Sequence, residues 1–529
     1  MSSIVRQKVG KYIYLYESFS YRDSSGQPRN HKKPVGKIDP ISGHPVYKPE
    51  YIERRVKSGT PIDLPKPSPS FTLEQISQST LKEYGAFYLY QSLAESSGLL
   101  SILTRAFPNN WQQIFTLACY LVSSGDPALY LEDWLDRTDG YLVGSMSSQR
   151  ISELLASINV AERMTFYKEW GAYRSEQEYL ALDITSISSY SNLIGDVEWG
   201  YNRDGEDLPQ VNLCLLLGEK SCLPVYQTLY SGSLKDVSTL RATLAQASGV
   251  DLNKLLLVMD KGFCSTRNIN AMLDDPHDLR FVIAAPFTLI FAKKQIHSEK
   301  KDIDSLQNII VIGDDILRGV VKERIWSNGR KIFAHTFYNP AKAVRLRESL
   351  YAHVTVLKQE AEKDQHNPLF RTDFDRYLII RKSEKQGLGY TVNIRLDVVE
   401  NELERAGWLV LLSNDVADPQ EAITIYRTKD VVEKSFERLK NSLDLGRLRI
   451  HSENSMQNKV FVGFISLILT AAIHKVMLDQ GLYRRMTMKK LIKSLEKLRI
   501  QRINGNRILF PVTKEQKDIF KAFGLGEPV

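Results

Sequence analysis

The sequence predicts an α/β protein with a mixed β-sheet at its centre and helices on the faces of the sheet. Two patterns support this fold class. After residue 178 the apolar residues recur in strand-length runs, and helical patterns separate the later runs. Before residue 178, a β-rich stretch and a long helical stretch precede this core. The 529 residues allow roughly three or four domains, and a composition that is 43% hydrophobic and 25% charged is ordinary for globular proteins.

Two regions and a linker precede the core. Residues 1–60 are predicted to be β-rich, because VGKYIYLYESFSYRD alternates and SSGQ supplies a turn into the basic stretch RNHKKPVGKI. The Pro- and Ser-rich segment 61–71 is a predicted linker. Residues 72–177 are predicted to be a helical domain, since apolar residues recur at helical spacing in segments such as WQQIFTLACYLV.

Residues 178–290 form the first part of the predicted core. EYLALDITSISSYS, VNLCLLLG and CLPVYQTLYSG are three consecutive predicted strands. A helix, the run LNKLLLVMD, a second helix and the strand LRFVIAAP follow. The continuous apolar run is typical of a strand that is buried on both faces. Three strands followed by helix, strand, helix and strand is the order found in RNase H-like domains.

The second part of the core lies beyond a predicted β-rich insertion at residues 291–405, where short alternating strands replace the α/β rhythm. Residues 406–475 return to the core with GWLVLLSND and a charged helix. The apolar run VFVGFISLILTAAI is too short to span a bilayer and predicts a buried helix. Residues 476–529 form a basic C-terminal region. The N-terminus lacks the apolar region of a signal peptide, so we predict a cytoplasmic protein with no membrane contact.

The charged helix after the insertion carries the most informative motif. Tyr426, Lys429, Glu433 and Lys440 stand at spacing Y-x2-K-x3-E-x6-K in a stretch without Pro or Gly, which predicts one continuous helix. At about 100° per residue, the four side chains share one face of such a helix. A carboxylate among cations and an aromatic ring suits a site that holds a metal and a nucleic-acid backbone. The alternative is a solvated face of ion pairs.

The distribution of charge indicates a polyanionic partner. Residues 421–510 contain 18 Lys and Arg against 8 Asp and Glu, a net charge of +10, whereas the whole chain carries +8. Cations therefore surround the motif, as a phosphodiester substrate requires. A patch that serves only solubility is the alternative. The four cysteines contain no CxxC, which argues against a zinc ribbon and suits a reducing compartment. No Walker A loop or dinucleotide fingerprint is present.

Three acidic residues are candidates for one site. Asp183 lies in the first predicted core strand, Asp260 ends the buried strand, and Glu433 lies on the motif helix. Strand ends meet at one edge of an α/β sheet. Carboxylates that converge without a base need a cation, and hard oxygen ligands select Mg²⁺ or Mn²⁺. Two such ions can promote in-line displacement at phosphorus. The alternative is that these aspartates only cap helices.

Five ordered motifs resemble the DDE transposases of bacterial insertion sequences, in the cut-and-paste branch that carries the Y-x2-R-x3-E-x6-K (YREK) signature. Lys429 stands where this signature has Arg, which keeps the charge but loses the planar fork. ALDITSI and VMDKGF resemble the motifs of the two aspartates. GYNRDGEDLPQVNLCLLL and SGSLKDVSTL resemble the segments between these motifs.

The resemblance implies a role for each matched residue. Asp183, Asp260 and Glu433 would be the catalytic ligands of Mg²⁺ or Mn²⁺, with two ions bound. Tyr426, Lys429 and Lys440 would bind DNA phosphates. The implied activity is metal-dependent cleavage at the inverted-repeat ends of a transposon and strand transfer into target DNA. The implied partners are double-stranded DNA and a second copy of the chain, as a homodimer on DNA.

Two other functions remain open on the same core. One is an RNase H-like nuclease or resolvase without strand transfer. The other is a domesticated DNA-binding derivative, which predicts loss of an acidic ligand, although all three are present. The regions before residue 178 are expected to bind the DNA ends, with RNHKK (29–33) and SSQR (147–150) as candidate contacts.

Overall fold

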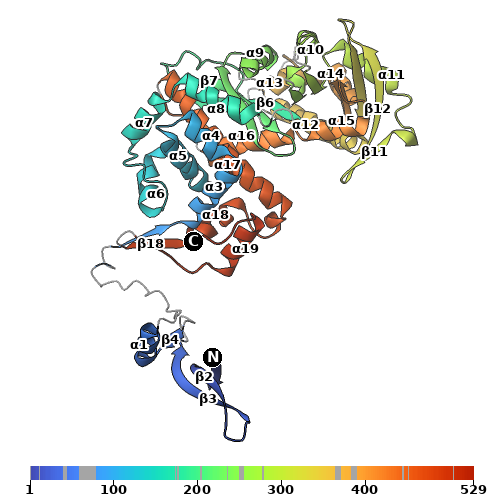
Figure 1. Cartoon of the computed structure of the whole chain (residues 1–529). Coiled ribbons are helices and arrows are strands. Elements are labelled where there is room, and N and C mark those ends of the chain that lie inside the picture. The colour runs from blue at the N-terminus through green and yellow to red at the C-terminus, as the bar shows by residue number, and fades with distance from the viewer. Residues whose placement is uncertain are drawn as a thin grey trace. The chain divides into compact units, whose positions relative to one another are not determined.

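The computed structural model of the chain describes two compact units. One comprises Met1–Thr80 with Arg502–Arg507, and the other comprises Leu81–Gln501 with Ile508–Val529 (Figure 1). The predicted linker at 61–71 lies outside the described residues. The described residues are 2–10, 12–39, 45–58, 75, 79–172, 174, 178–202, 205–234, 236–249, 255–276, 279–363, 371–382, 390–443, 446–450, 452–503 and 506–528.

The N-terminal unit is a small antiparallel sheet with one helix. The sheet has the order β1-β2-β3-β4, and α1 (Pro49–Lys57) packs on it through a small core of Leu15, Val35 and Tyr51. The predicted N-terminal β-rich region is therefore present. The strands are β1 (Ser2–Val9), β2 (Tyr12–Arg22), β3 (Pro28–Ile38) and β4 (Pro45–Tyr47).

The second unit begins with the predicted helical region. Ser147 caps α7 by accepting a hydrogen bond from the backbone N–H of Arg150, as a Ser at this position favours. The elements are β5 (Thr80–Glu83), α3 (Gly85–Ser96), α4 (Leu99–Ala106), α5 (Trp111–Ser123), η1 (Ala128–Tyr130), α6 (Leu131–Arg137), α7 (Ser148–Ser157) and α8 (Val160–Ala172).

A ten-stranded mixed sheet forms the centre of the second unit. Its order is β11-β12-β13-β16-β10-β9-β6-β7-β8, with β17 beside β6. The pairs β6–β9, β9–β10 and β6–β17 are parallel and the others are antiparallel, so the predicted mixed α/β sheet is confirmed. The RNase H-like assignment stays a prediction. The elements up to residue 284 are β6 (Leu180–Ser189), β7 (Gln210–Gly218), β8 (Pro224–Ser231), α9 (Asp236–Gly249), β9 (Leu256–Met259), η2 (Lys261–Phe263), α10 (Thr266–Leu273) and β10 (Arg280–Ala284).

The segment predicted as a β-rich insertion has two parts. The first part extends the main sheet, because β13 pairs with β16 from Phe333 opposite Ser413 to Tyr338 opposite Trp408. Alternation alone predicted these strands but not the sheet that they join. Its elements are α11 (Ile290–Glu299), η3 (Leu306–Asn308), β11 (Ile309–Ile312), β12 (Asp315–Ile325) and β13 (Lys331–Tyr338).

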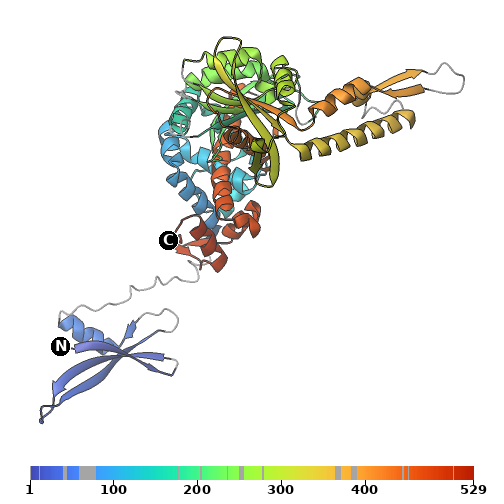
Figure 2. The same ribbon diagram turned by 90° about the vertical axis from the view of Figure 1, so that its right-hand side faces the viewer.

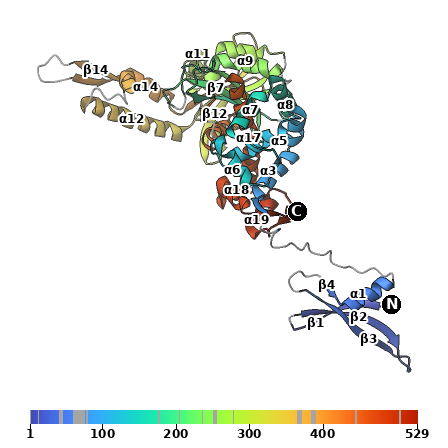
Figure 3. The same ribbon diagram turned by 90° about the vertical axis from the view of Figure 1, so that its left-hand side faces the viewer.

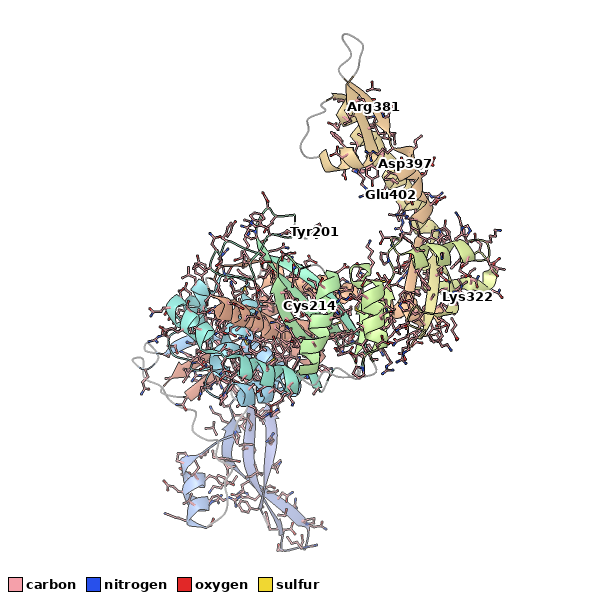
Figure 4. All side chains as sticks on the ribbon, turned by 90° about the horizontal axis from the view of Figure 1, so that it is seen from above. Tyr201, Cys214, Lys322, Arg381, Asp397 and Glu402 are labelled. Atoms are coloured by element: carbon pink, nitrogen blue, oxygen red, sulfur yellow. The ribbon has the colours of Figure 1, made fainter. Side chains whose placement is uncertain are left out.

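The second part of this segment is an arm with a hydrophobic core of its own, which includes Leu357, Phe374 and Val399. Figures 2 and 3 show the arm extending away from the main sheet. In Figure 4, Arg381 and Asp397 mark the arm and Cys214 marks the main sheet. The arm consists of α12 (Pro340–Lys363), α13 (Arg371–Tyr377), β14 (Leu378–Lys382), β15 (Tyr390–Ile394) and α14 (Leu396–Arg405).

The chain then returns to the sheet and ends in helices. α17 (Glu453–Asp479) is long and apolar enough to cross a membrane, but 78% of its apolar window is buried in the protein, where it packs against α5, α7 and β8. The predicted buried helix is confirmed, and it runs past the predicted boundary at residue 475. The other elements are β16 (Trp408–Ser413), α15 (Pro419–Arg427), α16 (Asp430–Ser442), β17 (Arg447–Leu448), η5 (Leu482–Arg484), α18 (Met488–Glu496), β18 (Arg499–Ile503), β19 (Asn506–Leu509) and α19 (Lys514–Ala522).

Phe461 on α17 is expected to be essential for stability. Its ring is fully buried and lies 5.3 Å from the ring of Phe107 and 5.2 Å from that of Phe166. Phe461→Ala should lower the free energy of unfolding by about 3–5 kcal/mol, because it removes buried contacts and leaves a cavity. The exposed Leu478 on the same helix is the control, and Leu478→Ala should change it by less than about 0.5 kcal/mol. Urea unfolding measures both, and equal losses would contradict this account of the core.

Candidate functional site

The register of two parallel strands places Asp183 beside Asp260. The β6–β9 ladder pairs Leu180 with Leu257 and ends with Leu182 opposite Met259; the next residue of β6 is Asp183, and Asp260 directly follows the end of β9. Neighbouring residues in register point to the same face of a sheet. Asp183 is half-buried, whereas every other residue of β6 is buried. The sheet is therefore open at this point.

The predicted continuous motif helix is wrong, because the structure breaks it into α15 and α16. Tyr426 lies in the last turn of α15, and Lys429 precedes the first residue of α16. At the junction the backbone N–H groups of Thr428 and Lys429 bond three residues back, and the Thr428 hydroxyl donates to the carbonyl of Ile425 at 2.5 Å. A Thr hydroxyl that bonds the backbone competes with the helical ladder. Tyr426 and Glu433 therefore belong to two separate helical segments.

Tyr426 on α15 contacts Asp260, one of the three predicted carboxylates. The Tyr426 hydroxyl donates a hydrogen bond to Oδ1 of Asp260 at 2.9 Å. Burial raises the pKa of Tyr426 strongly, and the nearby Asp260 carboxylate raises it further. The phenol therefore stays protonated and acts as a donor that fixes the Asp260 carboxylate.

Lys429 lies among the three predicted carboxylates. Its Nζ is 2.8 Å from Oε1 of Glu433. Burial lowers the pKa of Lys429, but the Glu433 hydrogen bond and the charges of Asp260 and Asp183 outweigh burial, so the net shift is upward. The Lys429 ammonium is therefore bonded to Glu433 and lies within the electrostatic influence of Asp260 and Asp183. It links the three carboxylates by charge, although only Glu433 is in contact with it.

Two cavities lie beside these residues, and each cavity is lined by a different part of the motif. The first cavity, of about 720 Å³, is lined by Asp183, Glu433 and Lys440. The second cavity, of about 1280 Å³, is lined by Asp260, Tyr426 and Lys429. The Lys429–Glu433 ion pair joins the lining of the second cavity to that of the first.

Carboxylate oxygens are the hard donors that Mg²⁺ and Mn²⁺ prefer, so the chemistry of Asp183, Asp260 and Glu433 fits such an ion. In the described part of the chain, however, no group of three or more His, Cys, Asp or Glu side chains lies close enough to hold a metal ion. Glu433 is bonded to Lys429. Metal binding at these residues stays a prediction.

The structure adds two residues that the sequence did not indicate. Glu206 and Arg447 also line the first cavity and form an ion pair at 2.7 Å. Arg447 reaches this place because β17 pairs with β6. Glu206 and Arg447 are 241 residues apart in the sequence. An ion pair over that separation leaves no local sequence signal.

The candidate DNA contacts before the core have different surroundings. The RNHKK residues lie on β3 and are exposed. In SSQR, Arg150 is exposed and forms an ion pair with Glu153 at 2.7 Å, so this cation already has a partner. DNA contact at either segment stays a prediction.

The fold and the site define an α/β protein whose mixed sheet carries Asp183 and Asp260 on two neighbouring parallel strands in its interior. Residues 174–469, more than half of the 529, match the family described as Transposase DDE domain. The chain belongs to the DDE transposase family, and the matched range contains all three carboxylates. No curated protein matches the chain. It is similar to a solved structure, a piggyBac transposase synaptic complex with hairpin DNA, at 10% identity and a TM-score of 0.36 over 77% of this chain and 70% of that one.

The Tyr426–Asp260 hydrogen bond can be measured directly. A double-mutant cycle of Tyr426→Phe and Asp260→Ala should give a coupling energy of about 1.5–3 kcal/mol in unfolding, because the acceptor is charged and the donor is largely buried. The control is a cycle of Tyr426→Phe with Asp415→Ala, whose carboxylate is bonded to Tyr179 instead. Additive effects in the first cycle would show that the two side chains do not interact.

Proposed function

We propose that the protein is a cut-and-paste transposase of a bacterial insertion sequence, of the YREK branch. It cleaves DNA at the inverted-repeat ends of its element and joins the freed end to target DNA. The observation that carries the proposal is the register of Asp183 beside Asp260, with Glu433 linked to them through Lys429, inside the matched DDE domain.

Each site residue has a role in this proposal. Asp183, Asp260 and Glu433 would hold two ions of Mg²⁺ or Mn²⁺, and bound ions would supply Lewis-acid activation of the phosphodiester. Tyr426 orients Asp260 through its hydrogen bond. Lys429 offsets part of the negative charge of the carboxylates and offers its ammonium to a DNA phosphate. Lys440, which lines the first cavity, offers another cation.

The proposal includes the RNase H-like assignment of the sheet, a cytoplasmic location and a homodimer on DNA. Inverted repeats present two equivalent ends, and a symmetric dimer offers one site to each. The partner is double-stranded DNA.

The chemistry is tested on DNA ends taken from the sequence that flanks the gene. We expect Mg²⁺-dependent cleavage and strand transfer, and Asp183→Asn, Asp260→Asn and Glu433→Gln should each lower the rate at least about 100-fold, since each removes a carboxylate from the metal site. Glu421→Gln, at an exposed acid on α15, is the matched control and should keep the activity.

Gel analysis of the products separates the alternatives. Cleavage without joined products would indicate a nuclease or resolvase, and binding without cleavage would indicate a domesticated derivative. Full activity in any one of the three acidic variants would remove that residue from the site.

We also propose that the N-terminal unit binds the DNA backbone. Residues 1–58 contain 12 Lys and Arg against 5 Asp and Glu, a net charge of +7. Within RNHKK, Arg29 is paired with Asp23 at 3.0 Å, so Lys32 and Lys33 are the stronger candidates for phosphate contacts.

Lys32→Ala/Lys33→Ala should raise the Kd for duplex DNA at least about tenfold at low salt, because two phosphate contacts are lost. Lys48→Ala/Lys57→Ala removes the same charge from exposed positions of the same unit and is the control. Gel-shift titration measures both. An equal effect of the two double variants would show that only net charge matters.

A further inference from the structure

The second cavity extends well beyond the acidic group. Its lining includes Asp260 and Tyr426 and also residues from the start of α12 and the end of α14, the two helices that join the arm to the sheet. Its volume of about 1280 Å³ exceeds the roughly 300–1,000 Å³ of a usual small-molecule pocket. The space therefore suits part of a larger ligand.

Three cations from these helices face the cavity. Lys342 and Arg345 lie one turn apart on α12, and Arg405 is the last residue of α14. Neither Lys342 nor Arg345 forms an ion pair with any carboxylate in the described part of the chain. In contrast, Arg427 in the same cavity is paired with Asp315 at 2.9 Å.

The placement of these cations favours the binding of an anion. Two like charges one helical turn apart repel each other, so their position does not stabilise the helix. Arg405 lies with its guanidinium 6.0 Å from the centre of the Phe287 ring, a contact that leaves its N–H donors available to another group. A ligand that carries several negative charges in a row would contact all three side chains.

We propose that this cavity binds the phosphate backbone of the DNA strand next to the scissile bond, with Lys342, Arg345 and Arg405 as its contacts. The inference rests on the proposed function, since Asp260 in the same cavity belongs to the proposed catalytic site. The arm then serves to position these three cations. The core of the arm packs α12 against α14, and Nη2 of Arg347 donates to the carbonyl of Leu403 at 3.5 Å, so the arm holds the three cations in place.

The first test measures binding of the full chain to a fluorescent duplex of mixed sequence by anisotropy, at several NaCl concentrations and in EDTA, so that no cleavage occurs. Lys342→Ala/Arg345→Ala should reduce the slope of log K against log[NaCl] by about 2, since each lost phosphate contact removes about 0.9. Lys293→Ala/Lys294→Ala removes the same number of charges from exposed positions on α11 outside the cavity, and should leave the slope unchanged.

The second test locates the DNA. All four native cysteines are buried, so an added surface thiol can be labelled selectively. Ser349 lines the cavity, whereas Thr355 is exposed on α12 outside it. Ser349→Cys should crosslink to a duplex that carries a bromoacetamide on one backbone phosphorothioate, as the thiol sulfur displaces bromide, and Thr355→Cys should not.

The outcomes separate this inference from the proposed function. A slope that falls only in the cavity variant, with crosslinking only at residue 349, supports the inference even if no cleavage is found on any DNA end. An unchanged slope in the cavity variant, equal slopes in the two double variants, or equal crosslinking at residues 349 and 355 overturns it, even if the wild-type protein cleaves and joins DNA.

Discussion

The parallel pairing of β6 with β9 is the constraint on which the site depends. It sets Asp183 beside Asp260 although the two residues are distant in the sequence, and hydrogen bonds of the sheet hold the backbone of both strands in register. Strands that are buried on both faces cannot slip without exposing apolar side chains. The acidic pair is thus as rigid as the core of the protein, and the other groups of the site are added to it by helices.

The two helical segments α15 and α16 add those groups. α15 brings Tyr426 to Asp260, and α16 brings Glu433 near Asp183 and the first cavity. Lys429 stands at the junction, forms an ion pair with Glu433 and offsets part of the negative charge of the three carboxylates. The motif thereby supplies side chains to the linings of both cavities.

The sequence predicted the mixed sheet, the buried helix and the neighbouring strands that carry Asp183 and Asp260, because these depend on local apolar patterns and on strand ends. It did not predict the break in the motif helix, since no Pro or Gly marks it and a single Thr hydroxyl contact lies at the junction. The sequence also did not predict the pairing of β13 with β16 or the Glu206–Arg447 ion pair. Both are contacts between distant segments, for which a single sequence holds no register information.

The central claim is that Asp183, Asp260 and Glu433 form one cation-binding group, and that Lys429 offsets part of the negative charge of this group in the structure. Calorimetric titration of Mn²⁺ into the full-length chain tests it most directly. We expect binding in the wild-type protein, at least about tenfold weaker binding in Asp183→Asn and Asp260→Asn, and tighter binding in Lys429→Met, because a competing positive charge is removed. Affinity for Mn²⁺ that is the same in all four proteins would contradict the claim.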